Sequence, residues 1–508
     1  MRYEVPLDYK SVAPLRPQQH GTAVAAETPQ EAVLRPLSAP PPAAVARAEK
    51  PLDSGLPPPT PSSADTLPRK NETLLLKKGH ALTYAGLFLF TTVLYFRPYE
   101  LIPALAGVSY IALGCALFTI AAYAPSQLAL EGTLTANLRE VKLVLWLGLT
   151  GLLSIPLAIN PGEAWATFTD TFLRAVLIFI VIVNVARTER RLMWLIFLSL
   201  GAGVFVSLTA LDQYRLGNFT VEGYRVAGAL GGIFGNPNDM AIHLVSMVPI
   251  AVALCLSARN FLKKLIYGSC TVLLVAGTVV TFSRGAFLGL SCAIAVLALK
   301  LGRRNRLAML PLLLAAAIGF FALAPSNYSG RLASIFDHSL DLNDSASTRQ
   351  QILTRSIIVA LRHPLFGIGM GNFHIMSIHE LVSHNAYTQV ASEMGLTALV
   401  LYVMFMVSPL RRLRQVERET FAERRGKQQR RFYYLAIGLQ ASLIAYMVSS
   451  FFGSVAYLWY VYYLVGYAVC LRRLYESETG RAVGGSTTDG EAIPQSQPTS
   501  AATAVASV

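Results

Sequence analysis

Long, uninterrupted apolar runs fill the middle of the chain, and short polar stretches separate them. A run such as LMWLIFLSLGAGVFVSLTAL has the length, about 20 residues, that a helix needs to cross a bilayer. These runs are continuous, whereas the strands of a membrane barrel alternate over segments of about ten residues. Backbone groups in hydrocarbon must pair internally, which helices achieve. The pattern therefore predicts an all-α fold, a polytopic transmembrane helical bundle.

We expect about twelve helices, with only a tight turn between the two that flank Ser283. The predicted ranges are 80–97, 103–124, 141–158, 168–186, 191–211, 239–258, 262–282, 285–301, 307–324, 385–410, 432–453 and 455–472.

Composition agrees with a membrane protein. Of the 508 residues, 53% are hydrophobic and only 14% are charged, whereas roughly 25% of the residues of a soluble protein are charged. The net charge of +14 would suggest a nucleic-acid partner in a soluble protein. Here it reflects basic connections between helices, so we expect membrane lipids and no nucleic acid as partners.

Basic residues fall in alternate connections, which the positive-inside rule assigns to the cytoplasm. This predicts that both termini are cytoplasmic. The basic groups are Arg139 and Lys142; Arg187, Arg190 and Arg191; Arg259, Lys263 and Lys264; Arg303, Arg304 and Arg306; the loop 411–431; and Arg472 and Arg473.

Two polar tails flank the predicted transmembrane domain, which spans 80–475. Residues 1–79 are rich in proline and alanine, and residues 476–508 are similarly polar. Such composition cannot bury a core, so both tails are predicted to be disordered. A partner-binding polyproline segment in the first tail is the alternative.

The opposite, non-cytoplasmic face carries two long loops, 212–238 and 325–384, and a tight turn at 283–285. Long loops are usually functional or disordered. The string STRQQILTRSIIVALRHP in the second loop predicts an amphipathic helix at the interface, followed by a glycine turn, GIGMGN. Its predicted apolar face comprises Ile352, Leu353, Ile357, Ala360 and Leu361, with Arg349, Arg355 and Arg362 largely elsewhere.

Two arginines on this face are candidate anion-binding residues. Arg225 lies in YRVAGALGGIFGNPNDMA, where Asn238 or Asp239 is a plausible N-cap for the next helix. Backbone N–H groups at that helix start would suit an anion beside Arg225, although an ordinary capped loop is the alternative. Arg284 lies between two apolar runs, a costly position unless it faces water, a partner or a ligand. Snorkelling at a helix end is its alternative.

The string ELVSHNAYTQVASEMGLTALVLY places His384 and Asn385 at the entry to a membrane helix and Glu393 about two turns into it. Histidine is the side chain most readily used as a base near neutral pH. An intramembrane carboxylate suggests a functional site. Capping or an interface contact for His384, and a structural ion pair for Glu393, stay open.

Other polar features have simpler interpretations. Asp170 and Arg174 have the spacing of a helical ion pair, and His243 is interpreted as structural. The string GIGMGNF lacks the βαβ context of a dinucleotide site. Five cysteines lie inside apolar runs without metal-like spacing and are interpreted as packing residues: Cys115, Cys255, Cys270, Cys292 and Cys470.

The depth of the candidate residues bears on the type of function. Arg225, Arg284, His384 and Glu393 all map to the outer third of the membrane or outside it. A secondary transporter would place its ionisable residues near the midplane. The distribution therefore favours an enzyme that works at the outer leaflet.

Four strings carry a family resemblance: RVAGALGGIFGNPND, TFSRGAFLGL, STRQQILTRSIIVALRHPLFGIGMGNF and SHNAYTQVASEMGL. In order, spacing and predicted sidedness they resemble the signatures of the O-antigen ligase/O-antigen polymerase superfamily, over about 80–475. The tail before this region is outside the family pattern. The family's usual aromatic residue shortly after the loop arginine is also missing, since Gln350, Gln351 and Ile352 follow Arg349.

The resemblance implies a metal-independent, cofactor-free membrane glycosyltransferase of GT-C type in the bacterial inner membrane. Its donor would be an undecaprenyl-diphosphate-linked glycan at the periplasmic face, and its acceptor lipid A-core, another glycan or a protein. Arg225 and Arg284 would hold the donor diphosphate, and His384 would act as a base or orient the acceptor hydroxyl. The residues expected to bind or support substrate are Arg349, Asn385, Glu393 and Asn238.

We therefore expect an O-antigen ligase first and a surface-polysaccharide polymerase second. A polysaccharide transporter or flippase is the alternative of another class, which midplane charges would favour. A non-enzymatic membrane scaffold would not need Arg284 and His384 on one face.

Overall fold

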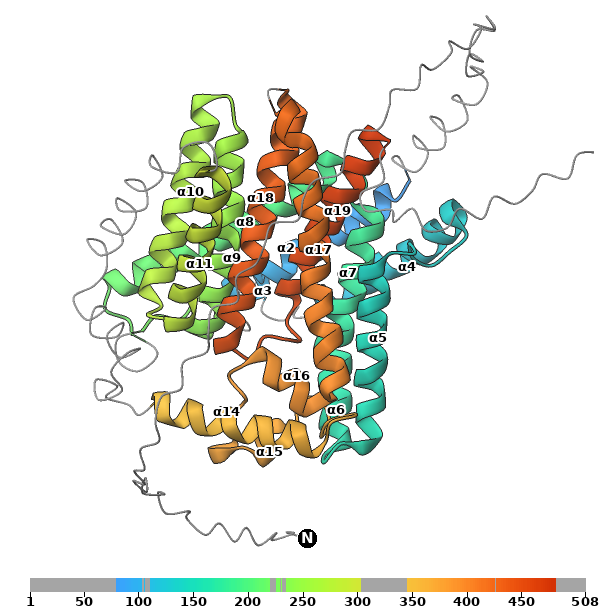
Figure 1. Cartoon of the computed structure of the whole chain (residues 1–508), viewed down its shortest axis with the longest axis vertical. Coiled ribbons are helices and arrows are strands. Elements are labelled where there is room, and N and C mark those ends of the chain that lie inside the picture. Colours follow the sequence, from blue (N-terminus) through green and yellow to red (C-terminus); the bar gives the residue numbers. More distant parts are fainter. Residues whose placement is uncertain are drawn as a thin grey trace, which may run out of the picture. The chain divides into compact units, whose positions relative to one another are not determined.

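The computed structural model describes residues 79–102, 105, 110–219, 225–228, 230, 234–302, 345–424 and 426–480. The chain divides into two compact units, Met1–Ser62 and Ser63–Val508, and all the described residues belong to the second. Within these ranges the secondary structure is helical, with no β-strand (Figure 1). The predicted all-α transmembrane bundle is confirmed.

The first half of the described chain contains α2 (Ala81–Phe96), α3 (Pro98–Leu101), α4 (Ile111–Glu131), α5 (Arg139–Ser154), η2 (Ile155–Leu157), α6 (Pro161–Thr167), η3 (Phe168–Phe172), α7 (Leu173–Val185), α8 (Glu189–Arg215), α9 (Pro237–Ser257), α10 (Phe261–Val280) and α11 (Arg284–Leu301). The second half contains α14 (Ser345–Arg362), α15 (Phe373–Met376), η7 (Ile378–Glu380), α16 (Ala386–Met394), α17 (Leu396–Glu423), α18 (Lys427–Ser449), η8 (Ser450–Phe452) and α19 (Trp459–Thr479).

Nine helical segments of the described chain are long and apolar enough to cross a membrane. They are α4, α5 with η2, α6 with η3 and α7, α8, α9, α10, α11, α17, and α18 with η8. The helices α2 and α19 also belong to the bundle. The predicted helix 307–324 lies outside the described residues, so the total of about twelve stays a prediction.

The centre of the bundle is formed by α9, α18 and α19, which are buried over most of their length. Small residues bring the first two together: a Cβ added at Gly438 of α18 would overlap Ala253 and the Pro249 carbonyl of α9. Close approach at small residues is how helices associate where lipid supplies no hydrophobic force. By contrast, most residues of α4 and α10 are not buried inside the protein.

Tyrosines of α19 link the centre to its neighbours by hydrogen bonds. Tyr463 shares a 2.9 Å bond with Thr91 of α2, and Tyr467 shares a 2.6 Å bond with Ser199 of α8. A buried phenol costs free energy unless its hydroxyl finds a partner. These pairs fix α19 against α2 and α8.

The predicted helix 385–410 is wrong in one respect, because Gly395 divides it into α16 and α17. Gly395 has a φ of +92°, and a Cβ there would overlap the Leu365 carbonyl. The Leu396 N–H donates to the Pro364 carbonyl at 2.7 Å, which holds the break against the preceding loop. The sequence had indicated that Glu393 lies inside a membrane-spanning helix. The structure instead places it in the short helix α16.

The amphipathic helix predicted in the second long loop is present as α14. Its side toward the protein includes Ile352, Ser356, Val359 and Ala360, which are buried. Ile357 and Leu361 of the predicted apolar face are exposed on the protein surface. The contact of this face with the membrane interface stays a prediction.

Several helix boundaries also differ from the sequence prediction. The helix expected at 103–124 is observed as α4, Ile111–Glu131. The predicted loop 411–431 is mostly helical, because α17 continues to Glu423 and α18 begins at Lys427.

The helix expected at 168–186 begins at Pro161, where Asn160 caps it, and passes through the π-helical turn η3. The N-cap of α9 is Asn236, whose side chain accepts from the Asn238 N–H at 2.8 Å, and not Asn238 or Asp239. Pro237 then occupies the first helical position. Residues 476–479 of the expected C-terminal tail belong to α19. The rest of that tail beyond 480, and residues 1–78 of the first tail, lie outside the described residues.

The helix ends form two contrasting groups (Figure 1). At one end lie the connections between α9 and α10 and between α17 and α18, where Arg431 pairs with Glu189 and Arg430 donates to the Leu256 carbonyl. The other end carries α6, α14, α15 and α16, with α14 running crosswise to the long helices. The basic connections that the structure describes thus gather at one end, while Arg303, Arg304 and Arg306 lie outside the described residues.

Candidate functional site

Arg225 is buried in the loop before α9, with 3% of its surface exposed. Its Nε donates to the Thr281 carbonyl at 2.9 Å, and its Nη2 donates to Oδ1 of Asn238 at 2.7 Å. One guanidinium therefore joins the loop, the first turn of α9 and the turn after α10. Arg225 thus lies beside the start of α9, where Asn238 accepts a hydrogen bond from the arginine. Anion binding at this helix start stays a prediction.

Arg284 is the first residue of α11, and Ser283 caps the helix by accepting from the Ala286 N–H. The turn that separates α10 from α11 is as tight as predicted, with Phe282 at a φ of +53°. Since Thr281 accepts from Arg225 and lies three positions before Arg284, the two arginines share one corner of the bundle. A Cβ at Gly285 would overlap Phe452, so this corner packs against η8.

His384 lies in the loop before α16, with a φ of +50°. Its backbone N–H donates to Oγ of Ser454 at 2.8 Å. Burial and, to a smaller extent, the positive charge of Arg349 on α14 together lower the pKa of His384 to about 4. The imidazole is therefore neutral at pH 7 and able to accept a proton.

Asn385 is the N-cap of α16, because its Oδ1 accepts from the N–H groups of Tyr387 and Thr388. Ser383 donates to the Asn385 carbonyl at 2.9 Å and tightens the same turn. The capping alternative considered for His384 thus applies to its neighbour. Asn385 fixes the backbone that carries His384.

Glu393 is almost fully buried, and its Oε2 accepts from the Gly371 N–H at 2.9 Å and from the Tyr457 hydroxyl at 2.8 Å. Burial raises the pKa of Glu393 to about 7, against the opposing effect of these two donors. The carboxyl group thereby holds the glycine turn, in which Gly367, Gly369 and Gly371 all have positive φ. Its contacts are those of a supporting residue behind the loop, and not of a structural ion pair with an arginine.

These residues are linked through the segment Phe452–Tyr457, between α18 and α19. Phe452 packs against Gly285, next to Arg284. Ser454 accepts a hydrogen bond from the His384 N–H, and the Tyr457 hydroxyl donates one to Glu393. The structure therefore brings Arg225, Arg284, His384 and Arg349 to the same end of the bundle. Glu393 lies behind them, connected through Tyr457.

Sequence reasoning missed Ser454 and Tyr457. Their partners are 70 and 64 positions away, so no local pattern reveals the contacts. The only available signal is the polar Gly-Ser pair between two apolar runs, at the face where His384 was expected.

The simpler interpretations can also be compared with the structure. Asp170 and Arg174 form the predicted ion pair, at 2.6 Å on the surface. His243 is buried among aromatic rings, with the ring centroids of Tyr95 and Phe234 each 5.5 Å away. Among the described residues, no three His, Cys, Asp or Glu side chains form a group that could hold a metal ion.

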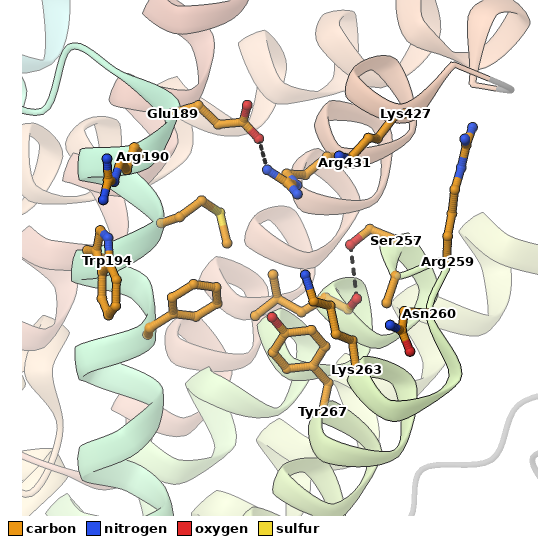
Figure 2. Close-up of a pocket in the computed structure, with 14 residues that line it drawn as sticks. Glu189, Arg190, Trp194, Ser257, Arg259, Asn260, Lys263, Tyr267, Lys427 and Arg431 are labelled. Carbon is orange, nitrogen blue, oxygen red and sulfur yellow. Dashed lines mark hydrogen bonds and ion pairs between the residues drawn. The ribbon is translucent and has the colours of Figure 1, made fainter.

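A cavity of about 820 Å³ lies at the basic end of the bundle, between α8, α10 and α18 (Figure 2). None of the predicted site residues lines it. The cavity and the predicted site residues thus lie at opposite ends of the bundle. We assign the candidate site to the end that carries His384, because polar groups with displaced pKa values converge around it.

Comparison with known proteins finds one family that matches part of the chain. A family model described as O-antigen ligase matches residues 269–403. The matched region contains Arg284, Arg349, His384 and Glu393, whereas Arg225 precedes it. A search of curated proteins finds no match. The resemblance of the chain to the O-antigen ligase superfamily, whose members are glycosyltransferase-like ligases and polymerases, is confirmed over these residues.

Proposed function

We propose that this protein transfers a glycan from an undecaprenyl-diphosphate carrier to an acceptor hydroxyl at the periplasmic face of the bacterial inner membrane, as an O-antigen ligase does. The observation that carries the proposal is the convergence of Arg225, Arg284, Arg349 and His384 at one end of the bundle, around the segment Phe452–Tyr457. The O-antigen ligase match over 269–403 supports the same class of reaction.

The donor's leaving group explains the need for arginines. A lipid diphosphate is doubly anionic, and guanidinium groups bind phosphate oxygens through two parallel hydrogen bonds. Arg225 and Arg284 share one corner of the bundle and would hold the diphosphate there. Positive charge fixed at this place also stabilises the negative charge that develops as the diphosphate departs.

His384 would serve the acceptor. The acceptor oxygen forms a bond to the anomeric carbon of the glycan, the bond from that carbon to the diphosphate breaks, and the hydroxyl proton passes to the imidazole. His384 is neutral in the free protein because burial and Arg349 lower its pKa to about 4. A bound diphosphate would oppose the effect of Arg349 and bring the pKa of the imidazole closer to neutrality.

Asn385 and Glu393 would act by positioning. Asn385 caps α16 and sets the backbone of His384, and Glu393 holds the glycine turn beside it. Both substrates are partly lipidic, so a site at the membrane interface brings them together without a soluble intermediate.

Substitution of the site residues tests the proposal in purified protein supplied with a lipid-diphosphate-linked glycan and candidate acceptors. We expect His384→Ala and Arg284→Ala each to lower the rate of transfer about 100-fold or more, because each removes a group that acts on the transition state. The matched control is Arg174→Ala, which removes an exposed arginine from a surface pair.

The control should transfer at the wild-type rate, with all variants showing the same melting behaviour. The acceptor consumed separates a ligase, which glycosylates lipid A-core, from a polymerase, which joins a second lipid-linked glycan. Full activity of folded His384→Ala and Arg284→Ala would contradict the proposed site.

A further inference from the structure

The cavity at the basic end has no role in the transfer reaction proposed above. It opens between the start of α8, the start of α10 and the start of α18 (Figure 2). These three segments lie far apart in the sequence and come from different parts of the bundle. A molecule bound here would contact all three helices at once.

The rim of the cavity is strongly positive. Five basic residues line it, and the one acidic residue lining it, Glu189, is paired with Arg431. Figure 2 shows Lys263 and Arg431 pointing toward the space between the helices. The basic residues are Arg190, Arg259, Lys263, Lys427 and Arg431. The charge of the rim therefore suits an anionic group.

The wall below the rim is apolar and aromatic. Trp194 and Phe197 of α8 and Tyr267 of α10 line the cavity, and the Phe197 and Tyr267 rings stack with centroids 6.2 Å apart. Beside it, the first turns of α10 expose Phe261 and Leu262, which are 78% and 60% accessible. In a membrane-spanning helix such residues face lipid chains. The cavity is thus polar at the helix ends and apolar toward the middle of the bundle.

We infer that this cavity binds an anionic phospholipid, with its phosphate at the basic rim and an acyl chain along Trp194, Phe197 and Tyr267. Basic pockets between transmembrane helices bind anionic head groups, and aromatic residues at helix ends lie at the level of those head groups. A soluble anion would use the rim but gain nothing from the apolar wall. A zwitterionic lipid would use the wall but gain little from the net positive charge.

The bound lipid fastens the start of α18 to α8 and α10. The protein already makes one such connection through the Arg431–Glu189 pair. A phosphate at the rim would offset the mutual repulsion of the remaining cations, which lie together at the helix ends. The site is independent of the transfer reaction, so its test can succeed or fail separately.

Native mass spectrometry of the delipidated full-length protein in detergent tests the inference. We expect phosphatidylglycerol to bind at least about tenfold more tightly than phosphatidylcholine, since each basic residue near the head group contributes. The double variant K263E/K427E should lose this preference, because both side chains are exposed lysines on the rim. The matched control R411E/R414E makes the same change of charge on exposed positions of α17, outside the cavity, and should keep it.

A competition experiment distinguishes the lipid from a soluble anion. Glycerol 3-phosphate at millimolar concentration should leave bound phosphatidylglycerol in place, because it lacks the acyl chain. Displacement by glycerol 3-phosphate, equal binding of the two phospholipids, or equal loss in the two double variants would each overturn the inference.

Discussion

At the residue scale, His384 lies where two effects act on its charge in the same direction. Burial disfavours the imidazolium, and the nearby Arg349 guanidinium repels it, so the pKa falls to about 4. A base must be deprotonated before it can act, and this histidine is deprotonated in the free protein at any pH above about 4. Its protonation state therefore depends on residues, such as Arg349, that are close to it in space.

This environment predicts an unusual pH profile. The acidic limb of kcat/KM for glycan transfer reports the free enzyme's base, so it should fall near pH 4 and not near 6.5. In Arg349→Gln one of the two lowering effects is removed, so the pKa of His384 rises and the limb moves to higher pH. Arg362→Gln, on an exposed arginine of the same helix, should leave the limb unchanged. A limb near 6.5 in the wild type that Arg349→Gln does not move would contradict the role of His384.

The site residues differ in how clearly the sequence reveals them. Arg284 and His384 stand out because charged or titratable side chains beside apolar runs are costly, and the structure brings them to the same end. Ser454 has no such signal, since it acts by accepting the His384 N–H from a distant part of the chain. Glu393 was noticed for its charge, yet its contacts with Gly371 and Tyr457 show a supporting position that the sequence does not reveal.

At the element scale, helix breaks and helix boundaries were harder to predict than the helices themselves. An apolar run follows Gly395, and no other Gly or Pro lies between Asn385 and that run, so the sequence indicates one helix. The break arises from tertiary contact, because the Pro364 and Leu365 carbonyls pack against the backbone at this point. The break leaves α16 as a short helix that carries Asn385 and Glu393.

Substitution of this glycine should therefore be costly. Gly395→Ala places a Cβ at a φ of +92° and against the Leu365 carbonyl, and we expect destabilisation of about 1–3 kcal/mol. Thermal unfolding of the purified protein in detergent measures the effect. Gly114→Ala is the control, since Gly114 lies inside α4 with open space around it and should be neutral or slightly stabilising. Equal melting temperatures for both variants would show that the break is not held by contact.

A buried ion pair between α5 and α19 gives a second prediction at this scale. Arg472 donates to Oε1 of Glu140 at 3.1 Å, and the glutamate side chain is fully buried. Arg472→Met leaves the carboxylate without its cation, which should cost about 3–5 kcal/mol, whereas E140Q/R472M should recover part of this loss. Arg174→Met breaks an exposed pair and should cost about 1 kcal/mol or less. The melting temperatures of the three variants provide the comparison; an Arg472→Met protein as stable as Arg174→Met would refute it.

At the scale of the whole molecule, the two ends of the bundle have different chemistry. Basic connections and the 820 Å³ cavity lie at one end, while the candidate site lies at the other. Hydropathy and the alternation of basic connections predicted this separation, because both are properties of long stretches of sequence. The contacts of Arg225 with Thr281 and of His384 with Ser454 were not predictable, because they depend on how helices from distant parts of the chain pack together.

Transfer by the purified wild-type protein in proteoliposomes is the measurement that tests this account most directly. Vesicles would carry an undecaprenyl-diphosphate-linked glycan and lipid A-core, and both the glycosylated acceptor and the released lipid diphosphate would be quantified. The account predicts that the two products appear in equal amounts and that neither forms with His384→Ala. Movement of the intact donor across the bilayer without formation of either product would contradict it and indicate a transporter.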